Sequence, residues 1–140
     1  MYIFWLWAQP VLAAIMDGFS YFFGGFDGVF FTLIIFIAAD YVLGVFCTIV
    51  EKKWSGKVGM HGILKKIAVL ILVGIGHMID THLLGGVSAL RTIILLFYIS
   101  YEGFSLLENA SAIGLPIPGK LREALLQLRN KSEGKDSLDS

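Results

Sequence analysis

Residues 30–50 read FFTLIIFIAADYVLGVFCTIV, and this stretch decides the fold class. Asp40 is its only charged side chain. A helix of about 21 residues rises about 30 Å, which matches the thickness of the hydrocarbon core of a bilayer. The stretch therefore predicts a membrane-spanning helix.

Two stretches further along the chain have the same character. Residues 64–84 read LKKIAVLILVGIGHMIDTHLL, and residues 90–110 read LRTIILLFYISYEGFSLLENA. Gly85 and Gly86 lie between them and favour a tight hairpin, because glycine adopts turn conformations at little steric cost. With 56% hydrophobic and 16% charged residues and a mean hydropathy of +0.77, the chain is too apolar for a soluble domain of its size. We predict an all-α integral membrane protein with three transmembrane helices.

Basic residues set the predicted orientation. The connection between the first two spans, taken together with the start of the second span, contains five lysines: Lys52, Lys53, Lys57, Lys65 and Lys66. The first 50 residues contain no lysine or arginine, whereas the C-terminal tail contains several. Loops rich in lysine and arginine stay in the cytoplasm. We therefore predict a multi-pass membrane protein with its N-terminus outside and its C-terminus in the cytoplasm.

The N-terminal segment, residues 1–25, is apolar but is interrupted by Pro10. Gln9, Asp17 and Ser20 recur in it near helical spacing. This pattern predicts an amphipathic helix that lies at the outer membrane interface. A fourth span and a cleaved signal peptide are the alternatives.

The remaining chain divides into two parts. Residues 26–113 form the predicted three-span domain, which ends at the GLPIP sequence of residues 114–118 because proline cannot continue a helix. Residues 114–140 are predicted to form a short cytoplasmic amphipathic helix followed by a disordered polar tail.

Each predicted span carries a polar edge. On the third span, five polar residues recur at spacings of 7, 4, 3 and 4 and so share one narrow stripe: Arg91, Tyr98, Glu102, Ser105 and Asn109. An ionisable group at the bilayer centre costs about 2.5 to 3.5 kcal/mol on insertion scales. The stripes are therefore expected to face other helices, a second copy of the chain or water. Glu108, near the inner end of the span, is expected to reach the interface.

Depth suggests two groupings of these residues. Asp80 and Arg91 flank the glycine hairpin at similar distances, which predicts an ion pair between them that is either functional or only a structural clamp. Asp40, His77 and Glu102 are expected to form a polar cluster near the middle of the membrane.

Other kinds of site find little support. His77, Asp80 and His82 lack a surrounding ligand set, so no metal site is predicted. The single cysteine, Cys47, excludes a disulfide within one chain. No nucleophile is accompanied by a base and an orienting group, so we predict neither an enzyme nor a cofactor.

Several motifs together resemble the phage lysis and toxin-secretion holin family, which comprises small clostridial and bacillar membrane proteins. The motifs are DYVLGVF (residues 40–46), WSGK (54–57), GILKK (62–66), MID (78–80), Arg91, FYISYEGFSLLENA (97–110) and GLPIPGKL (114–121). The similarity covers about residues 29–128, and residues 1–25 carry none of it.

The resemblance implies a non-enzymatic, phage-encoded or prophage-encoded protein that forms homo-oligomers in the lipid bilayer of the host's bacterial cytoplasmic membrane. It would open lesions at a set time, through which an endolysin or a large toxin crosses. A small ion or proton channel or transporter, using Asp40, His77 and Glu102, is the main rival interpretation. A membrane adaptor that binds a partner through its basic loop is the second. Nothing in the sequence indicates nucleic-acid binding.

Overall fold

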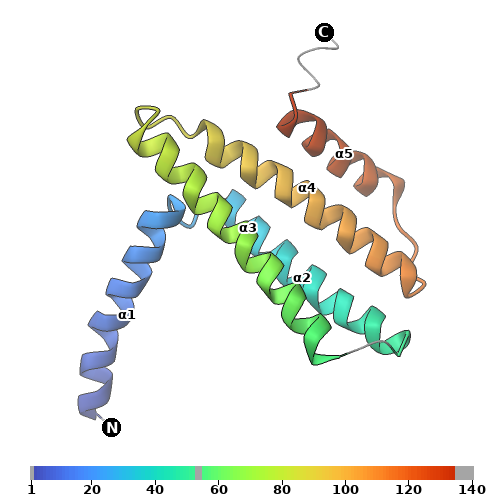
Figure 1. The fold of residues 1–140 in the computed structure, drawn as a ribbon, viewed down its shortest axis with the longest axis horizontal. Coiled ribbons are helices and arrows are strands. Elements are labelled where there is room, and N and C mark those ends of the chain that lie inside the picture. Colours follow the sequence, from blue (N-terminus) through green and yellow to red (C-terminus); the bar gives the residue numbers. More distant parts are fainter. Residues whose placement is uncertain (1, 53–54, 135–140) are drawn as a thin grey trace.

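The computed structural model describes residues 2–52 and 55–134 and folds them into helices, with no strand in these ranges (Figure 1). The helices are α1 (Tyr2–Phe23), α2 (Gly28–Val50), α3 (Gly56–His82), α4 (Ala89–Ala112) and α5 (Gly119–Ser132). The prediction of an all-helical protein is confirmed. Lys53 of the basic loop and residues 135–140 of the predicted tail lie outside the described residues.

Four of the helices, α1 to α4, are long and apolar enough to cross a membrane. The three predicted spans correspond to α2, α3 and α4, although α3 begins at Gly56, eight residues before the expected start. Large apolar side chains such as Phe31, Ile35 and Ile71 point outward from these helices. Such an apolar exterior is what a lipid-facing surface requires.

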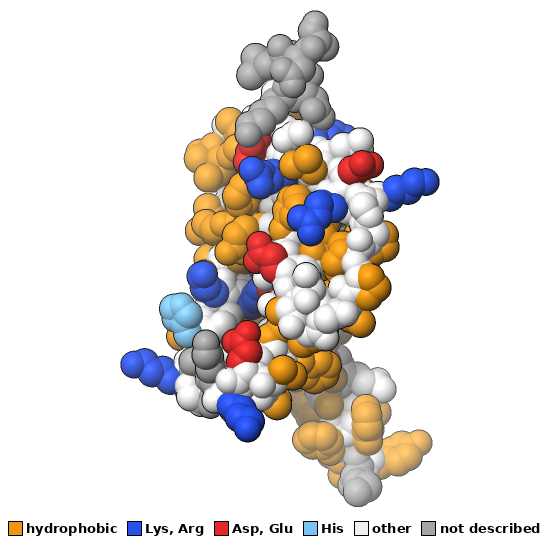
Figure 2. Space-filling model, turned by 90° about the vertical axis from the view of Figure 1, so that its right-hand side faces the viewer, with side chains coloured by type: hydrophobic (Ala, Val, Ile, Leu, Met, Phe, Trp, Pro, Cys, Tyr) orange, Lys and Arg blue, Asp and Glu red, His pale blue; other side chains and the backbone are white. Residues whose placement is uncertain are grey.

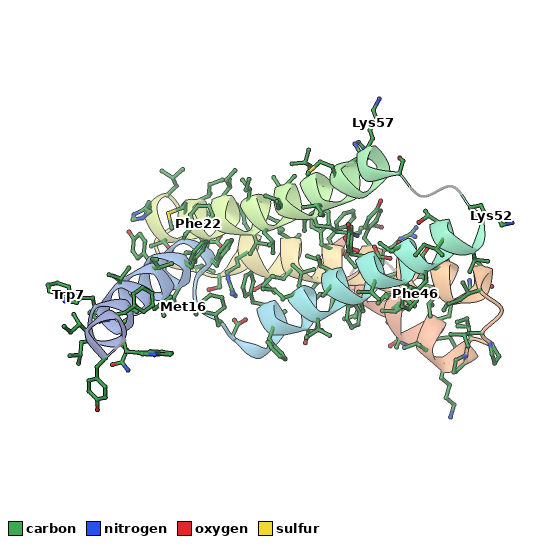
Figure 3. The ribbon with its side chains drawn as sticks, turned by 90° about the horizontal axis from the view of Figure 1, so that it is seen from below. Trp7, Met16, Phe22, Phe46, Lys52 and Lys57 are labelled. Atoms are coloured by element: carbon green, nitrogen blue, oxygen red, sulfur yellow. The ribbon has the colours of Figure 1, made fainter. Side chains whose placement is uncertain are left out.

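The bundle has two distinct ends. At the hairpin end, Gly85 and Gly86 join α3 to α4 with φ angles of +75° and +92°, the left-handed region that glycine favours. At the basic end, the exposed Lys52 and Lys57 flank the α2–α3 connection. Figure 3 shows both lysines at this end, on the side of the bundle opposite to α1.

Helix α4 is the centre of the bundle. It packs against α2, α3 and α5, whereas α2 and α3 touch each other little. An apolar core fills the half of the bundle nearer the hairpin end: Phe30, Leu33, Val69, Val73, Leu95 and Ile99. The half nearer the basic end contains charged groups instead.

Helix α1 leaves the bundle sideways near the hairpin end (Figures 1 and 3). None of its residues is buried, and Tyr21 and Phe22 in its last turn contact α3. There, the ring of Phe22 fills the space beside Gly74 that any larger residue would need. Trp7 and Met16 lie away from the bundle (Figure 3).

Helix α5 folds back along α4 after the connection at residues 114–118 (Figure 1). Its buried residue, Leu125, faces α4 and not an open surface. The predicted C-terminal helix therefore exists, and it contacts the bundle through Leu125, whereas Leu121 and Leu126 remain exposed.

Candidate functional site

Three helices bring one charged side chain each to a common point inside the bundle. The Lys66 ammonium of α3 donates to the Asp40 carboxylate of α2 and, at 2.6 Å, to the Glu102 carboxylate of α4. The side chains of Asp40 and Glu102 are only 6% and 1% exposed. Asn109 donates its amide to the second oxygen of Asp40 at 3.0 Å. We call Asp40, Lys66 and Glu102 the ionic cluster.

The ionic cluster lies near the middle of all three helices. Asp40 precedes the end of α2 by ten residues, and Glu102 precedes the end of α4 by the same number. Lys66 follows the start of α3 at Gly56 by ten residues. At 1.5 Å per residue, each charge is about 15 Å from the basic end. A bilayer around these helices would place the cluster deep in its hydrocarbon core.

The predicted cluster of Asp40, His77 and Glu102 was correct for the two carboxylates and wrong for the histidine. His77 lies eleven residues beyond Lys66 on α3, toward the hairpin end. Its Nε2 atom is 3.4 Å from the Thr81 hydroxyl. Lys66 shares the helical face of His77 in the sequence, so the signal was present. It was missed because Lys66, at the start of the predicted span, was expected to reach the membrane surface with the other lysines of the basic loop.

A groove beside the ionic cluster runs between α2, α3 and α4 and has a volume of about 620 Å³. Tyr98, Ser105 and Asn109 line it together with Glu102, so the predicted α4 stripe faces a single space. Arg91 of the same stripe lies elsewhere, at the hairpin end. Glu108 is exposed outside this groove.

The predicted ion pair between Asp80 and Arg91 is wrong. The Asp80 carboxylate accepts hydrogen bonds from the backbone N–H groups of Leu90, at 3.0 Å, and Arg91, at 2.8 Å. The first N–H groups of a helix lack partners within the helix, and Ser88 at the N-cap makes no side-chain capping bond. Asp80 therefore takes the place of the N-cap side chain of α4, where an anion is favoured by the helix dipole.

The Arg91 side chain instead holds the connection between α1 and α2. Its Nε donates to the Phe23 carbonyl at 2.6 Å, and Nη2 donates to the Gly25 carbonyl at 3.0 Å. Nη1 donates to the Asp27 carboxylate at 2.8 Å. Arg91 is 5% exposed, so it is a buried clamp at the hairpin end.

Asp27, in the connection between α1 and α2, is the third partner of Arg91 in this clamp. It caps α2 by accepting from the Phe30 N–H at 2.9 Å. The hydrogen bond from the Arg91 guanidinium is the main cause that lowers the pKa of Asp27 below its ordinary value of 3.8, against a smaller opposing effect of burial. The stabilisation that this carboxylate gives is therefore complete above about pH 5 and is lost only as the pH falls through the lowered pKa.

Gly24 makes the clamp possible, and substitution tests this. A Cβ atom there would lie 2.6 Å from His77 Nδ1 and 2.7 Å from Arg91 Nε, whereas a Cβ at Gly25 would meet nothing within 4 Å. Both glycines have positive φ angles. We expect Gly24→Ala to lower the thermal midpoint in detergent clearly more than Gly25→Ala, because both changes strain the backbone by about 1 to 3 kcal/mol but only the first displaces Arg91. Equal midpoints for the two variants would contradict the clamp.

Comparisons with known proteins place this arrangement in a family. The profile of the bacteriophage holin family matches residues 17–130, which include the whole ionic cluster and the Arg91 clamp. The chain belongs to the bacteriophage holin family. The resemblance that its motifs indicated is thus confirmed, and the family match leaves out most of α1.

Relatives of this holin-family chain occur in several bacterial species. An uncharacterized 14.9 kDa protein in the nagH 3' region of Clostridium perfringens is 42% identical over 81% of this chain and 86% of its own length. An uncharacterized protein of Listeria monocytogenes is 40% identical over 81% of both chains. The uncharacterized protein YtkC of Bacillus subtilis is 31% identical over 89% of this chain and 92% of its own. No solved structure matches the chain.

Proposed function

We propose that this protein is a holin that assembles into homo-oligomers in the bacterial cytoplasmic membrane and opens lesions there. An endolysin or a large toxin would cross through these lesions. The observation that carries the proposal is the ionic cluster of Asp40, Lys66 and Glu102, midway along three apolar helices of a holin-family protein. Buried charges at this depth are energetically costly in lipid. We therefore infer that they serve a later state in which water reaches them.

The proposed topology has α2, α3 and α4 as spans, with the basic end in the cytoplasm. Exposed Lys52 and Lys57 at that end support this orientation. The sideways course of α1 supports an interfacial position on the outer surface, although its length also suits a fourth span. Tyr2→Cys, combined with Cys47→Ser, distinguishes the interfacial from the spanning position of α1 before lesions form. An impermeant thiol reagent added to intact cells should modify it at an interfacial α1 and leave it unmodified if α1 spans.

The closed state needs no second copy to satisfy its polar groups. Among the described residues, no buried side-chain nitrogen or oxygen lacks a hydrogen-bond partner. Of the partners expected for the polar stripes, other helices of the same chain suffice, because Lys66 bonds to both Asp40 and Glu102. Monomers could therefore accumulate without leaking.

Opening would expose the same groups to water. The groove between the three helices, with a volume of about 620 Å³, already reaches the ionic cluster. In a ring of copies, separation of α3 from α4 would hydrate the charges along a lumen and reduce the cost of burying them. Charges within the membrane also respond to the membrane potential, which supplies a trigger when that potential falls.

Release of a cytoplasmic protein tests the function directly. The chain is expressed in a bacterium together with an endolysin that lacks a secretion signal, and release of a cytoplasmic enzyme is followed. We expect abrupt release with both proteins and none with the endolysin alone. Continued growth of the doubly expressing cells, with the chain present in the membrane, would refute the proposal.

Glu102→Gln tests the part played by the ionic cluster. The cluster contains two carboxylates and one ammonium group, so the substitution leaves a neutral Lys66–Asp40 pair that remains able to fold. We expect normal accumulation and a shifted time of lysis, because fewer charges then drive hydration of the lumen. Unaltered timing together with unaltered oligomer size would count against this mechanism.

A small ion or proton channel remains the second candidate, favoured by the opening of the groove onto the ionic cluster. It predicts loss of membrane potential without release of any protein. The release experiment above therefore separates the two functions.

A further inference from the structure

Helix α5 is seated closely on one side of α4. Leu125 is 4% exposed, and its side chain approaches Gly103 so closely that a Cβ atom there would lie 2.6 Å from Leu125 Cδ2. The guanidinium group of Arg129 lies over the ring of Phe104, at 5.9 Å from its centroid. These contacts lie beside Glu102, so α5 is held against the middle of α4.

The outer side of α5 is unsuited to lipid at this depth. Its exposed residues include four charged side chains: Lys120, Arg122, Glu123 and Lys131. Figure 2 views the molecule from this side and shows acidic and basic side chains spread among apolar ones. If α4 spans the membrane, a docked α5 would present these charges to hydrocarbon, which opposes docking at any lipid-facing position. Helix α5 should therefore stay on α4 only where water or protein meets its outer side.

The surface of α4 around Gly103, on which Leu125 is seated, has the character of a helix-packing face. Ser100, Gly103, Leu107 and Ala110 recur at spacings of 3, 4 and 3 and are all buried. Three of the four are small, which allows the backbones of membrane helices to approach closely. The Ser100 hydroxyl donates to the Phe97 carbonyl at 2.7 Å, so it needs no hydrogen-bond partner from another helix. This face is distinct from the one that carries Glu102 and Asn109 toward the groove.

We propose that α5 is a detachable cover and that, when it leaves α4 in the membrane, a second copy of this chain packs on the uncovered face. The two α4 helices would meet at Ser100, Gly103, Leu107 and Ala110. The proposal rests on the homo-oligomeric function proposed above and names its assembly surface. The seating of α5 demonstrates that the face accepts a helix, and its small residues favour an apolar helix over a charged one. The released α5 would lie on the inner surface of the membrane, where its basic residues meet anionic headgroups.

A disulfide between α4 and α5 tests the cover. In a Cys47→Ser background, Gly103→Cys and Leu125→Cys are combined. A Cβ at position 103 lies 3.3 Å from Leu125 Cγ, which is within reach of a disulfide once the leucine is replaced. The full-length protein is reconstituted in vesicles of phosphatidylethanolamine and phosphatidylglycerol, and subunits per spot are counted by single-molecule photobleaching, with dye release measured in parallel.

We expect the oxidised protein, with α5 held on α4, to be monomeric. Chemical reduction of the disulfide should restore the oligomers. Oligomers of equal size in both states would overturn the proposal. Oligomers that return on reduction without any dye release would support the assembly surface and overturn only the proposed lesion function.

Single cysteines test the surface itself. Oxidation of Gly103→Cys alone, again with Cys47→Ser, should give a covalent dimer of two chains. Tyr101→Cys is the matched control, because Tyr101 is exposed on another side of the same helix turn. Stronger dimer formation at position 101 than at position 103 would overturn the proposed contact.

Discussion

Replacing Lys66 with methionine is expected to prevent stable accumulation of the protein in the membrane. Asp40 and Glu102 would then face each other without the ammonium group that now bonds to both of them. Removing one partner of a buried ion pair costs about 3 to 5 kcal/mol, because the remaining charge stays buried without compensation. That is a large part of the 5 to 15 kcal/mol by which proteins are typically stable. Immunoblots of membrane fractions and thermal unfolding in detergent measure the loss.

Two controls make this prediction specific. Lys65→Met removes a lysine at the adjacent, exposed position and should leave accumulation unchanged. The triple variant Lys66→Met, Asp40→Asn and Glu102→Gln removes all three charges and should recover most of the lost stability, since a neutral polar group is cheaper to bury than an unpaired charge. Equal behaviour of the Lys65 and Lys66 variants would show that the ionic cluster does not form in the membrane.

Replacing Arg91 with methionine is expected to release α1 and the connection at residues 24–27 from the bundle. Arg91 is buried and donates hydrogen bonds to three residues: Phe23, Gly25 and Asp27. The Phe23 and Gly25 carbonyls are partly buried, and leaving a buried acceptor unpaired costs up to about 1 to 3 kcal/mol, whereas the half-exposed Asp27 carboxylate can bond to water. Hydrogen exchange should rise by at least about tenfold in residues 20–30 and remain unchanged around the ionic cluster, because about 1.4 kcal/mol corresponds to a factor of ten.

Asp27→Asn and Arg122→Met are the comparison variants for this clamp. Asp27→Asn keeps both carbonyl contacts of Arg91 and a capping side chain for α2, so its effect should be smaller. Arg122→Met changes an exposed arginine of α5 and should not affect residues 20–30. Unchanged exchange in the Arg91 variant would contradict the clamp.

Much of the fold follows from hydrophobic length and turn chemistry. The apolar stretches predicted at residues 30–50, 64–84 and 90–110 lie in α2, α3 and α4, and the Gly85–Gly86 hairpin has the backbone that glycine permits. The α4 stripe was readable because residues at helical spacing share a face whatever packs against them.

The pairing of charges was harder to predict because it depends on where helices begin. The predicted span of residues 64–84 puts Lys66 at its start, near the membrane surface. Because α3 begins at Gly56, Lys66 instead lies ten residues inside the helix and takes the place of His77 in the cluster. At the hairpin end, Asp80 satisfies backbone N–H groups, which a comparison of side-chain charges does not consider. Arg91 reaches the α1–α2 connection, more than 60 residues away in sequence, and no local pattern indicates that contact.

The most direct test of the account measures the size of molecules that the purified chain lets through a membrane. Vesicles loaded with a small fluorescent dye and with dextrans of increasing size are supplied with the protein, and the membrane potential is then dissipated. We predict that release of the dye is followed by release of dextrans as large as an endolysin. Loss of ions or of the small dye alone, with every dextran retained at high protein density, would contradict the proposed lesion and favour a channel.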